Sequence, residues 1–176
     1  MGASHEQATL MLKLYDLRRE AKLREAREWY VGSFHPSSME DMMKNYAPNT
    51  EGGTFLRMVV SYWEMVANLA NRGLVDEELL FETTGEQWIV WERMKPLIAA
   101  WRAGFKNPHA FGQLEEHVKR YEAWREKRAP GSNEVMRQMF AKMRAEKSAQ
   151  TEAASANGNS RRSLTRIPLR SFTEAS

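Results

Sequence analysis

The sequence contains no cysteine in its 176 residues. This excludes disulfides, thiolate metal ligands and a cysteine nucleophile, and it leaves the redox compartment open. No apolar run approaches the roughly 18 residues that a membrane-spanning helix needs. The N-terminal residues also lack the basic and apolar regions of a secretory signal. We therefore expect a cytoplasmic protein without a membrane span.

Residues that favour β-strands are also scarce. Val and Ile are few, whereas Ala, Leu, Met, Glu, Lys and Arg dominate, and these favour helices. The length suits a single domain of ordinary size. Six Trp, seven Phe, five Tyr and eleven Met supply enough large apolar surface for its core. The composition therefore predicts an all-α fold.

The excess of positive charge is small. The formal net charge of +3 comes from 26 Lys and Arg against 23 Asp and Glu. Four of these arginines and two of these glutamates lie in residues 148–176, so the remaining 22 basic and 21 acidic residues nearly balance. A mixed surface of this kind is not typical of a nucleic-acid-binding protein. Nucleic acid is therefore not expected as a partner, and weak, non-specific binding through the tail is kept only as an alternative.

Helical periodicity extends over residues 1–147, which form the predicted body. Capping residues and turn formers divide it into about five main helices and one or two short ones. The main helices are expected at about residues 4–31, 54–72, 84–104, 107–129 and from 132 onward, with short ones near 39–46 and 76–81. Short loops between them indicate an irregular antiparallel helical bundle.

The helix predicted at residues 54–72 is apolar on most faces, as is typical of a central helix with several neighbours. Its polar residues fall on one narrow line. With an adjacent tryptophan they form a candidate ligand pocket: Arg57, Ser61, Trp63, Glu64 and Asn68. If the line faces inward, Arg57 and Glu64 form a buried charge pair of the kind that often marks a functional site. If it faces outward, it is a thin strip of solvated surface, which is the reading that we favour.

Two glycines, Gly52 and Gly53, stand just before this helix in a segment rich in turn-forming residues. We interpret the segment 48–53 as a loop between two helices. Glycines before a helix N-terminus can also receive an anion, and this reading is kept as the alternative.

No motif of known catalytic or metal-binding chemistry is present. A di-iron bundle would need Glu-x-x-His pairs, whose two ligands share one helix face, and the sequence has none. In Glu115-Glu116-His117 the ligand types are adjacent, and neighbouring helical residues point about 100° apart. We therefore predict no metal site, no cofactor and no catalytic residues.

The sequence changes character near Ser148. Residues 148–160 have the Ala, Ser, Asn and Gly composition of a flexible linker. Residues 161–176 place apolar side chains among arginines, a pattern typical of a peptide that docks on a partner. The predicted partner-binding residues of this tail are Arg161, Arg162, Leu164, Arg166, Ile167, Leu169, Arg170 and Phe172.

These features predict a non-catalytic interaction protein. Its tail would dock on another protein or on a larger assembly, as a cargo, subunit or adaptor. The alternative is a helical bundle that binds or converts a small molecule, using the polar line of its central helix. The sequence leaves homo-oligomerisation open, because wide apolar faces can pair between chains as easily as within one.

Four short segments carry a recognisable pattern: Leu14-Tyr15-Asp16-Leu17-Arg18-Arg19-Glu20, Trp29-Tyr30, Phe34-His35-Pro36 and Ser61-Tyr62-Trp63-Glu64. In these segments the chain resembles a family of short, helix-rich bacterial proteins of unassigned function. The resemblance covers roughly residues 8–125 and leaves the tail outside it. It implies a bacterial origin and a helical fold, and it carries over no catalytic or binding residues.

Overall fold

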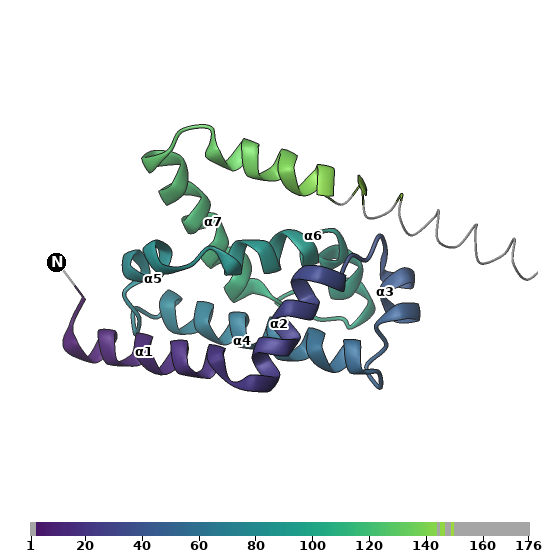
Figure 1. The fold of residues 1–176 in the computed structure, drawn as a ribbon, viewed down its shortest axis with the longest axis horizontal. Coiled ribbons are helices and arrows are strands. Elements are labelled where there is room, and N and C mark those ends of the chain that lie inside the picture. Colours follow the sequence, from purple (N-terminus) through teal and green to yellow (C-terminus); the bar gives the residue numbers. More distant parts are fainter. Residues whose placement is uncertain (1–2, 144, 147–148, 150–176) are drawn as a thin grey trace, which may run out of the picture. The chain divides into compact units, whose positions relative to one another are not determined.

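The computed structural model of the chain describes residues 3–143, 145–146 and 149 (Figure 1). Seven helices follow one another in these residues, and a further helical stretch covers 132–143. The seven are α1 (His5–Arg19), α2 (Ala21–Ser33), α3 (Met39–Asn45), α4 (Glu51–Asn71), α5 (Glu77–Thr83), α6 (Glu86–Gly104) and α7 (Gly112–Arg128). The described residues contain no β-strand, so the predicted all-α fold is confirmed.

The described residues divide after Pro130. All seven labelled helices belong to the compact unit that ends there, and the helical stretch 132–143 belongs to a second unit. The predicted docking tail at 161–176 and almost all of the predicted linker at 148–160 lie outside the described residues. Both therefore stay predictions.

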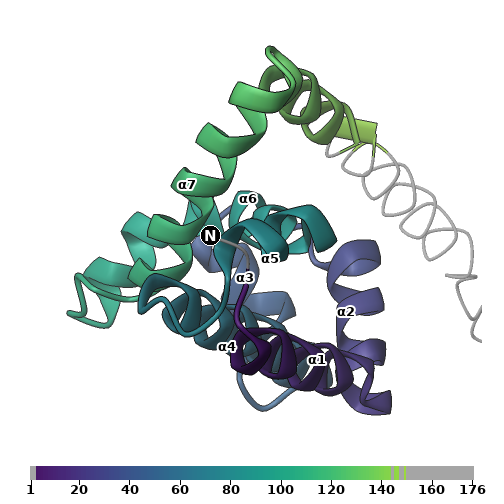
Figure 2. The same cartoon turned by 90° about the vertical axis from the view of Figure 1, so that its left-hand side faces the viewer.

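Helix α4 lies beside α1 and α2 in the first unit (Figures 1 and 2). It contacts α2, α6 and α7, as the sequence predicted for its most apolar helix. Among the side chains with almost no solvent exposure are those of Tyr30, Val59, Trp63, Trp88 and Leu114. They come from α2, α4, α6 and α7, so the core forms where these helices meet around α4.

Helices α1 and α2 replace the single helix predicted for residues 4–31, so that prediction was wrong. The two helices meet at Glu20, whose φ of −51° and ψ of 136° lie outside the helical region. The Glu20 carboxylate accepts a hydrogen bond from the Leu23 N–H at 2.8 Å and thereby caps α2. This capping stabilises the break, and α2 runs in a new direction from α1 (Figure 1).

Gly52 and Gly53 lie in the first turn of α4, so the prediction that they form a loop was wrong. The Thr50 hydroxyl caps this turn by accepting a hydrogen bond from the Gly53 N–H at 3.0 Å. A Cβ atom on Gly53 would lie 2.0 Å from the carbonyl oxygen of Ala47, and one on Gly52 would lie 2.9 Å from the Trp29 ring. The two glycines therefore allow the start of α4 to pack closely against its neighbours.

The connection between α6 and α7 also differs from the prediction. A helix was expected to begin at Asn107, but residues 108–111 form turns and α7 begins at Gly112. The Asn107 side-chain oxygen accepts a hydrogen bond from the His109 N–H at 3.1 Å. Asn107 therefore stabilises a turn and does not cap a helix, which is the other common role of asparagine at such positions.

Candidate functional site

A cavity of about 810 Å³ lies between α4, α6 and the connection that joins α6 to α7. We call it the α4 cavity. Its apolar lining includes Leu56, Met58, Val60, Met94, Trp101 and Phe111. Its polar lining is formed by Thr54, Arg57, Ser61, Glu64, Asn107 and His109. Clefts of this size, mostly apolar with a few polar groups, are typical of small-molecule sites.

The α4 cavity is lined by three of the five predicted pocket residues: Arg57, Ser61 and Glu64. The other two do not belong to it. Trp63 is 1% exposed and points to another side of α4, where its Nε1 donates to Oε1 of Glu86 at 3.2 Å. The Asn68 side chain accepts a hydrogen bond from Nε of Arg72 at 2.9 Å. The structure therefore gathers the first three residues of the predicted pocket and separates the other two from them.

Glu64 caps the neighbouring helix α7. Its two carboxylate oxygens accept hydrogen bonds from the backbone N–H groups of Gln113, at 3.1 Å, and Leu114, at 2.9 Å. These amides belong to the first turn of α7, whose own N-cap residue, Phe111, supplies no side-chain hydrogen bond. In the described residues Glu64 forms no ion pair with Arg57. Glu64 therefore belongs neither to a buried charge pair nor to a thin strip of solvated surface. It accepts hydrogen bonds from helix amides that would otherwise lack a partner.

We expect Glu64→Gln to lower the free energy of unfolding by about 1 kcal/mol. The amide offers one oxygen acceptor in place of two, and it loses the charge that favours a helix N-terminus. Urea denaturation followed by circular dichroism measures the change. Glu28→Gln, at an exposed position of α2, is the matched control and should change stability by less than about 0.5 kcal/mol. Equal effects of the two substitutions would contradict the capping role.

Phe111 forms part of the cavity wall in an unusual backbone conformation. Its φ of 59° and ψ of 21° lie in the left-handed region, which bulky side chains rarely adopt. The Trp101 ring packs edge-on against the Phe111 ring at a centroid distance of 5.3 Å. Arg102 fixes the preceding residue by donating two hydrogen bonds, both 3.0 Å long, to the carbonyl oxygen of Ala110. Strained residues that are held in this way concentrate at functional sites.

A buried polar cluster joins α1, α2, α4 and α6 through the carboxylate of Glu86. Arg18 donates to Oε2 of Glu86 at 2.6 Å, and Nε of Arg27 donates to Oε1 at 2.6 Å. Burial raises the pKa of Glu86, but the Arg27 hydrogen bonds and the charges of Arg18 and Arg27 outweigh it and hold the pKa below its usual value. The adjoining cavity of about 20 Å³ offers room for about one water molecule. The cluster therefore fastens helices and offers no space for a ligand.

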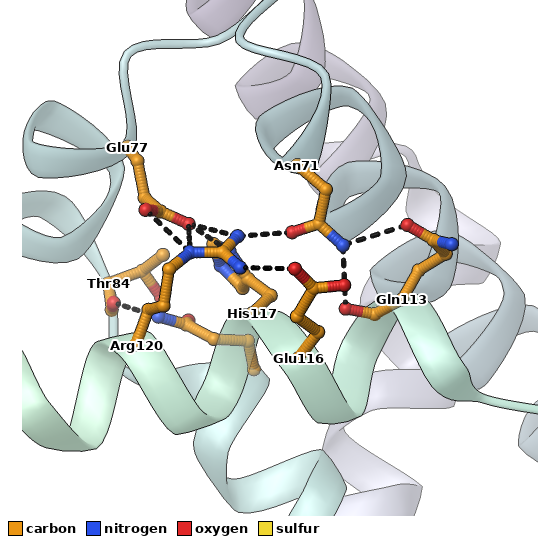
Figure 3. A network of polar contacts seen from close by, with 8 residues as sticks. Asn71, Glu77, Thr84, Gln113, Glu116, His117 and Arg120 are labelled. Atoms are coloured by element: carbon orange, nitrogen blue, oxygen red, sulfur yellow. Dashed lines mark hydrogen bonds and ion pairs between the residues drawn. The ribbon is translucent and has the colours of Figure 1, made fainter.

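A third polar network fastens α7 to α4 and α5 (Figure 3). Oε1 of Glu77 accepts a hydrogen bond from Arg120 at 2.7 Å and lies 3.0 Å from Nδ1 of the fully buried His117. Arg120 also donates to the side chain of Asn71. Burial raises the pKa of Glu77, but the hydrogen bonds from His117 and Arg120 outweigh it and lower the pKa to about 2. Glu77 is therefore charged at neutral pH and engaged by its neighbours.

Two further observations bear on the kind of site that the chain can carry. In the part of the chain that the structure describes, no group of three or more His, Asp or Glu side chains is arranged to hold a metal ion. None of the described helices is both long and apolar enough to cross a membrane. The α4 cavity combines a size and a lining that fit a small molecule.

The described part of the chain is thus a helical protein with an open, largely apolar cavity against its central helix. The chain belongs to the family described as a domain of unknown function, DUF4760, whose model matches residues 3–121. The matched region includes every residue that lines the α4 cavity. Comparisons with curated proteins and with solved structures give no significant match. The predicted resemblance to a helix-rich family of unassigned function is confirmed, and the bacterial origin stays a prediction.

Proposed function

We propose that this protein binds a small, largely apolar molecule in the α4 cavity. The observation that carries the proposal is the combination of size and lining. About 810 Å³ of space is bordered by the large apolar side chains of Met94, Trp101 and Phe111, with a few polar groups beside them. Sites for drug-sized ligands have volumes of about 300–1,000 Å³ and the same mixture of groups.

The way in which the cavity wall is held supports this proposal. Glu64 joins α4 to the start of α7, and Arg102 fixes the carbonyl group of Ala110 in the connection between α6 and α7. The strained backbone of Phe111 lies between Ala110 and the first turn of α7, both of which are held by these hydrogen bonds. A wall that is held in place before the ligand arrives reduces the ordering that binding would otherwise require.

We expect decanol, a neutral ten-carbon alcohol, to bind the full chain and to raise its melting temperature, because a ligand of the folded state stabilises that state. Ser61→Trp places an indole ring in the α4 cavity and should lower decanol affinity by about tenfold or more, through steric exclusion. Isothermal titration calorimetry measures both affinities. Met65→Trp adds the same ring at an exposed position of α4 outside the cavity lining and should leave the affinity unchanged. Loss of affinity in both variants, or in neither, would rule out binding in the α4 cavity.

A second proposal, docking through the tail, rests on sequence pattern alone. We infer it from the alternation of arginine and apolar residues in 161–176, which lie outside the described residues. The partner would be another protein or a larger assembly, with weak nucleic-acid binding as the alternative, and the expected location is the cytoplasm of a bacterial cell. What co-purifies with the chain before and after removal of residues 161–176 tests this proposal separately from the α4 cavity.

A further inference from the structure

We propose that the ligand of the α4 cavity carries an acidic group, which Arg57 binds. This inference rests on the proposed binding function and adds the chemical class of the ligand: an amphipathic carboxylic acid with an apolar body.

The two charged side chains of the cavity lining differ in whether a protein group of opposite charge compensates them. The cavity lining includes one arginine, Arg57, and one carboxylate, that of Glu64. Both oxygens of Glu64 accept hydrogen bonds from the amides at the start of α7, where the helix dipole also compensates a negative charge. Arg57 has no carboxylate partner among the described residues. The cavity therefore presents one uncompensated positive charge to its contents.

Arg57 is also positioned to receive a planar acidic group. Its guanidinium donates to the carbonyl oxygen of Pro48 at 2.7 Å and to the Thr54 hydroxyl at 3.2 Å. Two of the five N–H donors of the guanidinium are used in this way, and three remain. The two contacts restrict the side chain before a ligand binds, and a guanidinium fork matches the geometry of a carboxylate.

The rest of the lining suits an amphipathic molecule with its acidic end at Arg57. Arg57 and Ser61 are exposed, whereas Met94 is 1% exposed, so one part of the lining faces solvent and another part is deep. The side chains of Asn107 and His109 add polar groups to the same cavity. An alkyl or aryl body would lie against the deep apolar part, and the acid would remain near water, where its desolvation is least unfavourable.

Three ligands with the same ten-carbon chain test this inference on the full-length protein. At pH 7, decanoate is negative, decanol is neutral and decylamine is positive. Isothermal titration calorimetry should rank the affinities as decanoate above decanol above decylamine. We expect decanoate to bind about tenfold more tightly than decanol, which is the effect of roughly one charge-assisted hydrogen-bonded pair.

Substitutions at Arg57 then assign the preference to this side chain. Arg57→Gln should lower decanoate affinity about tenfold and decanol affinity by much less, so that the preference for decanoate over decanol is lost. Arg57→Lys keeps the charge but not the planar fork, so its loss should be intermediate. Arg72→Gln, at an exposed arginine of the same helix region that does not line the cavity, is the matched control and should bind all three ligands as the unmodified chain does.

The outcomes separate this inference from the proposed function. Equal affinity for decanoate and decanol, or tightest binding of decylamine, would overturn recognition of an acid. So would an Arg57→Gln variant that still prefers decanoate. In each of these cases the α4 cavity remains a binding site as long as Ser61→Trp weakens binding. If Ser61→Trp weakens the binding of none of the three ligands, the proposed function and this inference are both overturned.

Discussion

Glu86→Gln is expected to lower the free energy of unfolding by about 3 kcal/mol, because it leaves two partly buried arginines without their shared carboxylate. The Glu86 side chain is 10% exposed, and those of Arg18 and Arg27 are 18% and 20% exposed. Breaking a buried pair is more harmful than replacing it, since the remaining charges keep their desolvation penalty. The hydrogen bond from the Trp63 ring is weakened as well.

Urea denaturation at several pH values tests this expectation. The folded-state pKa of Glu86 lies below its usual value of 4.5. Its contribution to stability is therefore fully present above about pH 4.5 and is lost as the pH falls through the folded-state pKa. The difference between the unmodified chain and Glu86→Gln should be largest near pH 7 and should shrink in acid.

Glu78→Gln provides the control for Glu86→Gln. Glu78 pairs with Arg128 at 2.7 Å, but both side chains are about half exposed or more. An ion pair of this kind contributes no more than about 1 kcal/mol, and we expect no larger effect. If Glu86→Gln were as mild as Glu78→Gln, the cluster around Glu86 would not hold α1, α2 and α6 together.

Arg93→Met is expected to lower the free energy of unfolding by about 3 kcal/mol, because it removes the partner of several buried carbonyl groups. Arg93 projects from α6 to the end of α2 and is 7% exposed. It donates to the carbonyl oxygens of Tyr30 at 2.8 Å, Val31 at 2.6 Å and Phe34 at 2.6 Å. Methionine fills similar space and offers no hydrogen, so these helix-end carbonyls would lose the donor that satisfies them.

Lys95→Met is the control for Arg93→Met, and urea denaturation measures the stability of both variants. Lys95 is an exposed cation on α6 that pairs with Glu92 at 3.1 Å, and its loss should change stability by less than about 0.5 kcal/mol. Arg93→Lys should fall between the two, because a single ammonium group cannot reach all three carbonyls as the guanidinium does. A similar stability for Arg93→Met and Lys95→Met would show that α2 does not depend on this cap.

Much of the fold could be predicted from local sequence patterns. Helix periodicity and capping residues located α3 and α4 and the end of α6, because each of these depends on residues close together in the sequence. The break at Glu20 was missed although the sequence carried a signal: the apolar stripe of α1 changes phase before Leu23. The start of α7 was missed because the cap comes from Glu64, about 50 positions away along the chain.

The polar contacts that hold the fold together were largely beyond sequence reasoning. Glu86 meets Arg18 and Arg27 across separations of 68 and 59 residues, and no local pattern indicates such a meeting. Arg93 could have been found, because it stands three residues after Val90 and four before Leu97, both fully buried. A charged residue on a buried helical stripe needs partners, and this is a signal that a sequence does carry.

The predicted pocket illustrates the same limit at the candidate site. The polar line on α4 drew attention to Arg57, Ser61 and Glu64, and these three residues line one cavity. Its other walls include Trp101 in α6 and Phe111 before α7. Their meeting with α4 depends on tertiary packing, so the sequence did not connect them with the polar line. A line of polar side chains shows which face of a helix is polar. Whether a cavity lies against that face depends on the neighbouring elements.

Binding in the α4 cavity is tested most directly by methyl NMR of the full chain with isotope-labelled methionine, titrated with decanol. Met58 and Met94 line the cavity, whereas Met42 and Met65 do not. If decanol binds there, the Met58 and Met94 methyl signals shift saturably while those of Met42 and Met65 stay in place. Unmoved signals at Met58 and Met94, or equal movement of all four, would contradict binding in this cavity.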